Sequence, residues 1–207
     1  MKLWLVRHGE TSFNVGRPKF RGTFDVPLSD HGVQQAEAVG KALADIPFEV
    51  IYYSKLSRVR ITAEKISQYH PNARFEEEPL LYDMNFGDWE GKYVDEIFSE
   101  EERKRWYTKP SSFMIPNGET FHEVLDRLQR LFLRLRTQPE ENVCLVTHRA
   151  VINLIMVHLL RVSPDYFWQF HFDPTSVTQF KLLSENNTKI IFVNNIDHLK
   201  NLKENTS

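Results

Sequence analysis

The sequence predicts an α/β fold: a three-layer sandwich in which helices flank a mainly parallel central sheet. Short apolar runs at residues 3–6, 50–53 and 143–147 each lead into a stretch with helical periodicity. This alternation is typical of parallel α/β units. The chain has 207 residues and is 41% hydrophobic and 26% charged, which suits one globular domain with a large core. We therefore expect a single domain over residues 1–207.

Four segments are expected to form the helical layers. Ser29 is a suitable N-cap for a helix over about residues 30–45, and Ser57 is a suitable N-cap for the next helix. An amphipathic repeat over residues 121–135 is the clearest helix in the chain. Residues 149–160 are apolar on nearly all sides, so we expect that helix to be buried.

Two other segments depart from the strand–helix alternation. Residues 177–183 and 189–195 flank a polar turn, which predicts an antiparallel hairpin. From about residue 92 to 118 the pattern is irregular, charged and aromatic. We expect this stretch to be an insertion that forms a small cap over the C-terminal edge of the strands. Its large aromatic residues either pack inside the cap or stack on a base or ribose of a substrate; they are Trp106, Tyr107 and Phe113.

Composition and charge argue against several kinds of partner. The 26 Lys and Arg residues against 28 Asp and Glu residues give a net charge of −2, so no overall positive field attracts nucleic acid or an anionic membrane. We expect neither a membrane span nor a signal peptide, because no apolar stretch approaches the ~20 residues of a span. The single cysteine, Cys144, fits a reducing compartment. We expect a cytoplasmic protein whose partner is a small molecule, and the oligomeric state stays open.

Basic side chains follow three of the predicted strands. The first strand ends at Arg7 and His8, and the second leads to Arg58 at the start of its helix. The third strand runs into His148 and Arg149. Because ligands of parallel sheets bind outside the carboxyl ends of the strands, these side chains are expected to share one crevice. The sequence therefore predicts an anion site at this edge of the sheet.

The residue types in this crevice suit phosphoryl transfer. Arginine forks clamp the oxygens of a phosphoryl group better than lysine does. His8 is either a hydrogen-bond donor or a nucleophile that forms a phosphohistidine, and a protonated His148 would donate to the oxygens. A general acid must protonate the departing alkoxide, and the acidic segment 81–91 is its natural source. We expect no metal or cofactor, because His122 begins only a near match to a zinc helix that ends in Asp126.

Several motifs resemble, in order along the chain, those of the histidine phosphatase superfamily, also called phosphoglycerate-mutase-like. They are Arg7-His8-Gly9-Glu10-Thr11 with Asn14, Pro27-Leu28-Ser29-Asp30-His31-Gly32, Ser54 to Arg58 with Thr62-Ala63-Glu64, Phe86-Gly87-Asp88-Trp89-Glu90-Gly91 and Val146-Thr147-His148. The resemblance implies an α/β fold, a phosphohistidine on His8 and no metal. It also implies a phosphoryl pocket of Arg7, Arg58 and His148. Further phosphate and substrate contacts are implied for Asn14, Arg21 and Gly22.

The resemblance also narrows the activity. The short motif at residues 86–91 is similar to the phosphatase branch, because the longer insertion of the mutase branch is not found in the chain. Residues 116–121 resemble α-ribazole phosphatases, which remove the 5′-phosphate of a cobalamin precursor. A metal-independent phosphomonoesterase is therefore implied, with α-ribazole 5′-phosphate as one substrate. The alternatives are a broad-specificity phosphatase, a bisphosphate-dependent phosphoglycerate mutase and a non-catalytic phospholigand-binding module.

Three positions depart from the family pattern. Asp83 stands where these phosphatases usually have Glu, and we assign it the role of general acid by its position. Its carboxylate reaches ~1.5 Å less far than that of Glu, so Glu10 or Glu90 is an alternative acid, and Asp83 would then only order an arginine. Arg149 replaces the usual small residue after the second histidine, and Arg21 stands where Gln is common. Arg21 indicates either a more anionic substrate or a solvated basic loop.

Overall fold

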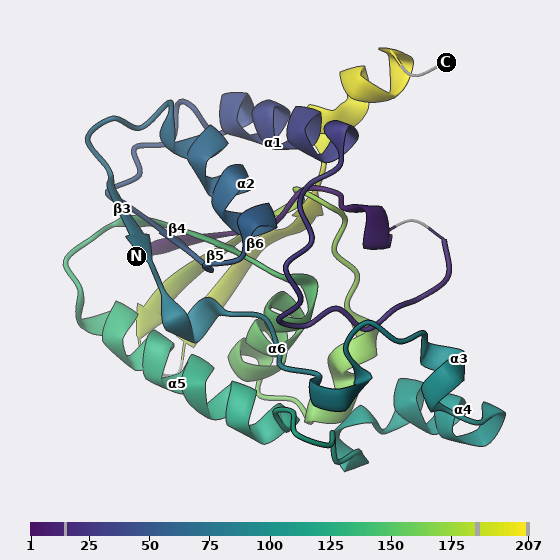
Figure 1. Cartoon of the computed structure of the whole chain (residues 1–207). Coiled ribbons are helices and arrows are strands. Elements are labelled where there is room, and N and C mark those ends of the chain that lie inside the picture. Colours follow the sequence, from purple (N-terminus) through teal and green to yellow (C-terminus); the bar gives the residue numbers. More distant parts are fainter. Residues whose placement is uncertain (15, 185–186, 206–207) are drawn as a thin grey trace.

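A six-stranded sheet forms the centre of the computed structural model, which describes residues 1–14, 16–184 and 187–205 (Figure 1). The strand order is β3-β2-β4-β1-β5-β6. The strands are β1 (Lys2–Arg7), β2 (Val50–Tyr53), β3 (Arg74–Glu77), β4 (Asn142–Thr147), β5 (Val177–Ser184) and β6 (Asn187–Asn195). The first four are parallel to one another, and β5 and β6 pair antiparallel. The predicted mainly parallel sheet and the predicted hairpin are confirmed.

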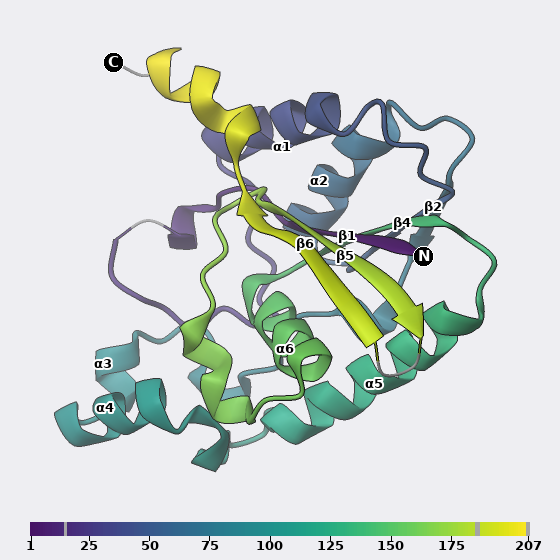
Figure 2. The same ribbon diagram turned by 180° about the vertical axis from the view of Figure 1, so that it is seen from behind.

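Helices cover both faces of the sheet (Figures 1 and 2). One layer holds α1 (Asp30–Ala42) and α2 (Ser57–Ser67), and the other holds α5 (Phe121–Thr137) and α6 (Arg149–Leu160). Alternate residues of β1 explain the two layers, because Leu3 and Leu5 pack in the core on the α5–α6 side. Trp4 and Val6 pack in the core on the α1–α2 side. The predicted three-layer α/β sandwich is confirmed. No helix in the described residues is long and apolar enough to cross a membrane.

The two predicted serine caps have different outcomes. Ser29 caps α1, because its hydroxyl accepts a hydrogen bond from the Gly32 N–H at 3.0 Å. The prediction for Ser57 is wrong, since α2 has Leu56 at the N-cap position and no side-chain cap. The Ser57 hydroxyl donates instead to the Asp25 carboxylate at 2.7 Å. The Ser57 hydroxyl therefore makes a tertiary hydrogen bond in place of the helix cap that the local sequence pattern predicts.

The segment predicted as a cap contains two short helices, α3 (Val94–Ile97) and α4 (Glu100–Thr108). Trp106 is 1% exposed and meets the rings of Trp89, Phe98 and Phe113 at centroid distances of 5.7, 5.6 and 5.3 Å. Phe20 joins the same group of rings. This aromatic cluster is continuous with the core on the α5–α6 side. Phe113 and Trp106 therefore pack inside the protein, and almost no surface of the Trp106 side chain is exposed.

The register of β1 on β4 decides where the predicted site residues meet. Arg7 pairs with Thr147, and the His8 N–H extends the ladder by donating to the Thr147 carbonyl at 3.0 Å. On the other side of β4, the Ser54 N–H donates to a β4 carbonyl at 3.3 Å. His8, Ser54 and His148 consequently lie at the carboxyl ends of three neighbouring parallel strands.

Candidate active site

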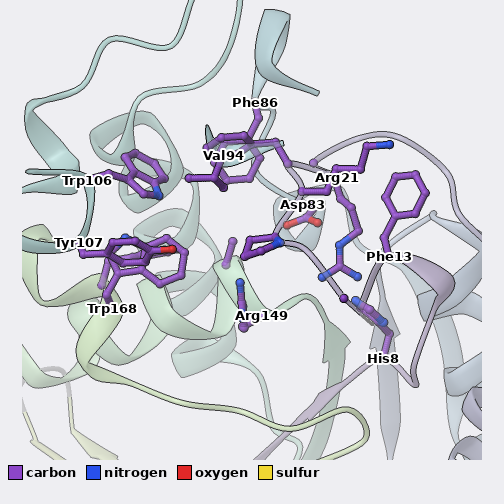
Figure 3. Close-up of a pocket in the computed structure, with 17 residues that line it drawn as sticks. His8, Phe13, Arg21, Asp83, Phe86, Val94, Trp106, Tyr107, Arg149 and Trp168 are labelled. Carbon is purple, nitrogen blue, oxygen red and sulfur yellow. The ribbon is translucent and has the colours of Figure 1, made fainter. Parts of the chain in front are cut away.

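A pocket of about 390 Å³ lies beside the carboxyl ends of these strands (Figure 3). Its volume is within the range of small-molecule sites. Four of the predicted site residues line it: His8, Arg21, Gly22 and Asp83. Three more are buried: Arg58 and His148 contact Asp83, and Arg7 is close enough to act on the pKa of His8. The structure therefore brings together the residues that the sequence placed at separate strand ends.

The ring of His8 is oriented by the neighbouring backbone. His8 Nδ1 lies 2.6 Å from the Gly9 carbonyl oxygen, and because a carbonyl only accepts hydrogen bonds, Nδ1 carries the proton. The lone pair is then on Nε2. Burial lowers the pKa of His8 well below its usual value, and the charges of Arg58 and Arg7 act in the same direction. Of the two roles open to His8, this geometry favours the nucleophile.

Asp83, His148 and Ser54 form a connected network beside His8. Asp83 Oδ2 accepts a hydrogen bond from Arg58 Nη2 at 3.0 Å and lies 3.3 Å from His148 Nδ1. His148 Nε2 lies 2.8 Å from the Ser54 hydroxyl oxygen. The rings of His8 and His148 meet edge to face, with centroids 5.4 Å apart. A carboxyl group and two imidazoles are therefore in one buried cluster.

The surroundings of His148 oppose the protonated state that the sequence predicts for it. Burial lowers the pKa of His148 well below its usual value, and Arg58 and Arg21 reinforce the shift. A neutral imidazole is favoured among these neighbours, because each nearby guanidinium opposes another positive charge. His148 then has a single ring N–H to offer a phosphoryl oxygen.

The burial of Asp83 favours the protonated carboxyl group that a general acid needs. Burial raises the pKa of Asp83 above the usual range of a carboxyl group, although the nearby charges of Arg58 and Arg21 oppose this. The alternative acids are held elsewhere. Glu90 accepts hydrogen bonds from the backbone N–H groups of Thr23 and Phe86 at 2.8 and 3.0 Å.

Glu10 is likewise occupied, because its carboxylate accepts a hydrogen bond from the Ser29 hydroxyl at 2.9 Å. Neither Glu10 nor Glu90 is among the residues that line the pocket. The geometry therefore favours Asp83 as the acid, because it is the carboxyl group of the three that lines the pocket.

Arg58 is held in place mainly by backbone carbonyl groups. Its side chain is fully buried, and it donates to the carbonyls of Phe24 and Gly22, both at 2.9 Å. Gly22 has φ of +51°, and a Cβ there would lie 2.0 Å from Glu90 Oε1. The chain needs glycine at this position, and Gly22 contributes to the pocket through its backbone.

Arg7 is fixed in the same manner, since its Nη1 donates to the Phe172 carbonyl at 2.6 Å. The Nε atoms of Arg7 and Arg58 are buried and have no hydrogen-bond partner within the described residues. Buried donors without a partner are rare and usually have a reason. Two guanidinium groups that act on His8 and have unused donors are suited to binding a phosphate.

Comparison with known proteins agrees with this chemistry. The profile of the Histidine phosphatase superfamily (branch 1) matches residues 3–195. The chain belongs to this superfamily. It is 32% identical over 173 residues to the adenosylcobalamin/alpha-ribazole phosphatase of Salmonella typhimurium, covering 82% of this chain and 85% of the relative.

Two further similarities extend over nearly the whole chain. The phosphoserine phosphatase 1 of Hydrogenobacter thermophilus is 30% identical over 203 residues, covering 96% of this chain and 94% of the relative. The solved structure of Bacillus stearothermophilus YhfR superposes with a TM-score of 0.86 at 28% identity, covering 96% of this chain and 99% of that one. This histidine phosphatase is therefore a phosphoric monoester hydrolase that acts on a small phosphorylated substrate.

The structure places the remaining predicted residues of this histidine phosphatase as follows. Arg21 donates from Nη1 to the Thr11 hydroxyl at 3.1 Å, and burial lowers the pKa of Arg21 to about 10. Arg149 lines the pocket. Asn14 is the last residue of a short 3-10 turn, but its side chain lies outside the described part, so its phosphate contact stays a prediction.

Two residues to which the sequence analysis gave no separate role support the site. Ser54 contacts His148, and its place directly after β2 was the available signal. Thr62 connects the loop after His8 to the helix that holds Arg58, because its hydroxyl accepts from the Gly9 N–H at 3.1 Å and donates to the Arg58 carbonyl at 2.8 Å. Within the described residues, no group of three or more His, Cys, Asp or Glu side chains is arranged to hold a metal ion.

Proposed function

We propose that this histidine phosphatase is a metal-independent phosphomonoesterase that works through a phosphohistidine intermediate on His8. The observation that carries the proposal is the 2.6 Å contact between His8 Nδ1 and the Gly9 carbonyl. It leaves the Nε2 lone pair of a residue that lines the pocket available for attack on phosphorus. The lowered pKa of His8 keeps this nitrogen unprotonated at neutral pH.

In the first half of the reaction, His8 Nε2 forms a bond to phosphorus while the bond from phosphorus to the ester oxygen breaks. Asp83 gives its proton to the departing oxygen. Arg7, Arg58 and His148 bind the three equatorial oxygens, on which charge is spread in the transition state. In the second half, water attacks phosphorus, Asp83 takes up the proton of the water, and the bond to Nε2 breaks. Neutral His8 and protonated Asp83 are thereby restored.

Two substrates are proposed, each on a different observation. α-Ribazole 5′-phosphate is supported by the Salmonella relative and by aromatic side chains in the pocket that are able to stack on a base, Tyr107 and Trp168. Phosphoserine is supported by the Hydrogenobacter relative and by Arg149, whose guanidinium suits a carboxylate. A broad-specificity phosphatase would accept both.

We also propose that the protein works in the cytoplasm and has neither nucleic acid nor a membrane as a partner. The net charge of −2 supports the second part, because the chain has no overall positive field. Cys144 supports the first part, because it is a free, buried thiol whose pKa is raised by burial. Such a thiol is compatible with a reducing compartment.

A trapping experiment tests the mechanism. The protein is mixed with radiolabelled para-nitrophenyl phosphate in EDTA and quenched in alkali, where phosphohistidine survives; later acid treatment releases the label. We expect protein-bound label in the wild type and none in His8→Ala. Label that persists in His8→Ala would place the intermediate elsewhere, and loss of turnover in EDTA would refute metal independence.

The same preparation separates the other functions. Phosphate binding without turnover of any ester would identify a non-catalytic binding module. Transfer of the label to phosphoglycerate rather than to water would identify a mutase. A panel with α-ribazole 5′-phosphate, phosphoserine and sugar phosphates then ranks the substrates by kcat/KM.

A further inference from the structure

Arg149 is a pocket cation whose pKa is lowered by burial, and the Asp83 carboxyl group is close enough to oppose that shift. It is the first residue of α6, is exposed to solvent and lines the pocket. No carboxylate among the described residues forms an ion pair with it, and the first turn of α6 has no acidic side chain. Its guanidinium lies instead over the ring of Trp168, 5.5 Å from the centroid. An arginine held by an aromatic face keeps its N–H donors available for an anion.

The pocket has more positive charge than one phosphoryl group neutralises. Arg149 and Arg21 are close enough to Arg7 that both lower its pKa, after burial itself. Arg58 adds a fourth guanidinium, and it acts on His8. The opposing carboxyl groups are Asp83, which is the one acidic side chain among the described residues that line the pocket, and Asp173, which acts on Arg7 from outside the lining. A phosphomonoester brings about two negative charges. The excess of positive charge favours a substrate with a second anionic group.

The position of Arg149 indicates where that group would bind. Figure 3 shows Trp106, Tyr107 and Trp168 on the side of the pocket opposite His8, with Arg149 between them. The ring of Trp168 lies 5.2 Å from that of Tyr107 and 5.9 Å from that of Trp106, so the three make a continuous aromatic wall. A substrate whose phosphate is at His8 would extend its body toward this wall and past Arg149.

We propose that Arg149 binds a second oxyanion on the body of the substrate, a carboxylate or a further phosphate. The substrate is then a phosphomonoester with an apolar or planar body and an additional negative group. This inference rests on the proposed function, because it takes the phosphoryl group to bind at His8. It ranks phosphorylated acids above α-ribazole 5′-phosphate, whose ribazole part has no second oxyanion.

Matched aryl esters test the proposal. Phenyl phosphate, meta-carboxyphenyl phosphate and the corresponding carboxamide differ little in shape, and only the second has the extra charge. We expect the wild type to prefer the carboxylate. In Arg149→Met, kcat/KM for the carboxylate should fall by about tenfold to a hundredfold, the loss typical of a charge-assisted hydrogen bond. For phenyl phosphate and the carboxamide, which have no charge beyond the phosphate, kcat/KM should fall about threefold at most, since the variant removes only a charge distant from the phosphate.

Two more variants and one more ester sharpen the comparison. Arg149→Lys keeps the charge without the planar fork, so it should retain part of the preference. Arg105→Met is the matched control, because Arg105 also lies over a ring, 4.6 Å from the centroid of Phe113, but it does not line the pocket. It should leave all the rates within about twofold. The fourth ester is meta-phosphonophenyl phosphate, which has a phosphonate in place of the carboxylate. A wild-type preference for this ester over the carboxylate ester would identify the second oxyanion as a phosphate, and the opposite preference would identify it as a carboxylate.

Two results would overturn the proposal. Equal losses on all three esters in Arg149→Met would mean that Arg149 acts on the phosphoryl group. No loss on any of them would mean that it contacts no part of the substrate. Failure of the proposed function has a different signature, namely no turnover of any ester by the wild type. In that case calorimetric dissociation constants for the same esters still measure the preference for the carboxylate, and its absence would overturn the inference.

Discussion

Replacing Asp83 by Asn separates the two roles that the structure leaves to this residue, acid catalysis and the ordering of Arg58. Asn keeps the size of the side chain and an oxygen that accepts from Arg58 Nη2, which is 3.0 Å away. The other carboxyl oxygen accepts from the Met84 N–H at 3.0 Å, and this hydrogen bond is lost because Asn has an NH2 group at that position. What it lacks is the proton that the raised pKa of Asp83 makes available.

The size of the effect depends on the leaving group. General acid catalysis contributes about 10²–10⁴-fold, which corresponds to about 2.7–5.5 kcal/mol of barrier. An alkyl phosphate needs all of it, because an alkoxide is a poor leaving group. Para-nitrophenolate leaves without a proton, so the rate on para-nitrophenyl phosphate should fall by about tenfold or less. The ratio of the two losses in Asp83→Asn is therefore the informative quantity.

Folding is monitored in the same samples. The Arg58 and Asp83 side chains are 0% and 9% exposed, and changing the hydrogen-bonding groups of so buried a pair is destabilising. With the Arg58 hydrogen bond kept and the Met84 hydrogen bond lost, the cost should be about 1–3 kcal/mol, a fall in Tm of about 2–12 °C for a chain of this size. The matched control is Asp88→Asn, an exposed carboxylate of the same acidic segment. Equal losses on both esters in Asp83→Asn would refute the acid role and assign Asp83 to the ordering of Arg58.

Stability should fall as the pH drops below about 6.5, the ordinary pKa of histidine. Burial lowers the pKa of both His8 and His148, so the unfolded chain takes up protons that the folded chain does not, and the stability present above that pH is lost toward the folded pKa values. Chemical unfolding across this range should show a slope about 1.4 kcal/mol per pH unit smaller in His8→Asn, and an unchanged slope would contradict the lowered pKa. Trp106→Ala should cost about 3–5 kcal/mol, because the side chain is 1% exposed inside the aromatic cluster. Thermal melting measures this loss against Tyr166→Ala, an aromatic residue that is 52% exposed; similar melting temperatures for the two variants would show that the cluster is not structural.

The parallel centre of the sheet is predictable from sequence because its strands are buried on both faces. Strands β1, β2 and β4 consequently read as unbroken apolar runs. Strand β3 is an edge strand whose residues, Arg74–Glu77, are exposed or half-buried. It has three charged side chains and no apolar run, and it is a strand because its backbone pairs with β2. No local pattern records that pairing.

The site divides in a similar way. His8 and His148 were predictable because each follows a buried parallel strand, where topology alone decides that ligands bind. The protonation state of His148 was not predictable, because it depends on burial and on Arg58, which comes from a distant part of the chain. The Ser57 hydroxyl was lost to Asp25, 32 residues away in the sequence. Contacts between residues so far apart in the sequence can be identified only once the fold is known.

The pairing of Arg7 with Thr147 has a consequence for how such a site diversifies. The two imidazoles stand on adjacent strands, and their 5.4 Å separation follows the spacing of about 4.8 Å between hydrogen-bonded strands. Moving one ring away from the other would require breaking the sheet itself. Tyr107 and Arg149, by contrast, lie on helix ends along the pocket wall. We expect substitutions at these helix ends to change the substrate specificity, while the distance between the two histidines stays fixed by the spacing of the strands.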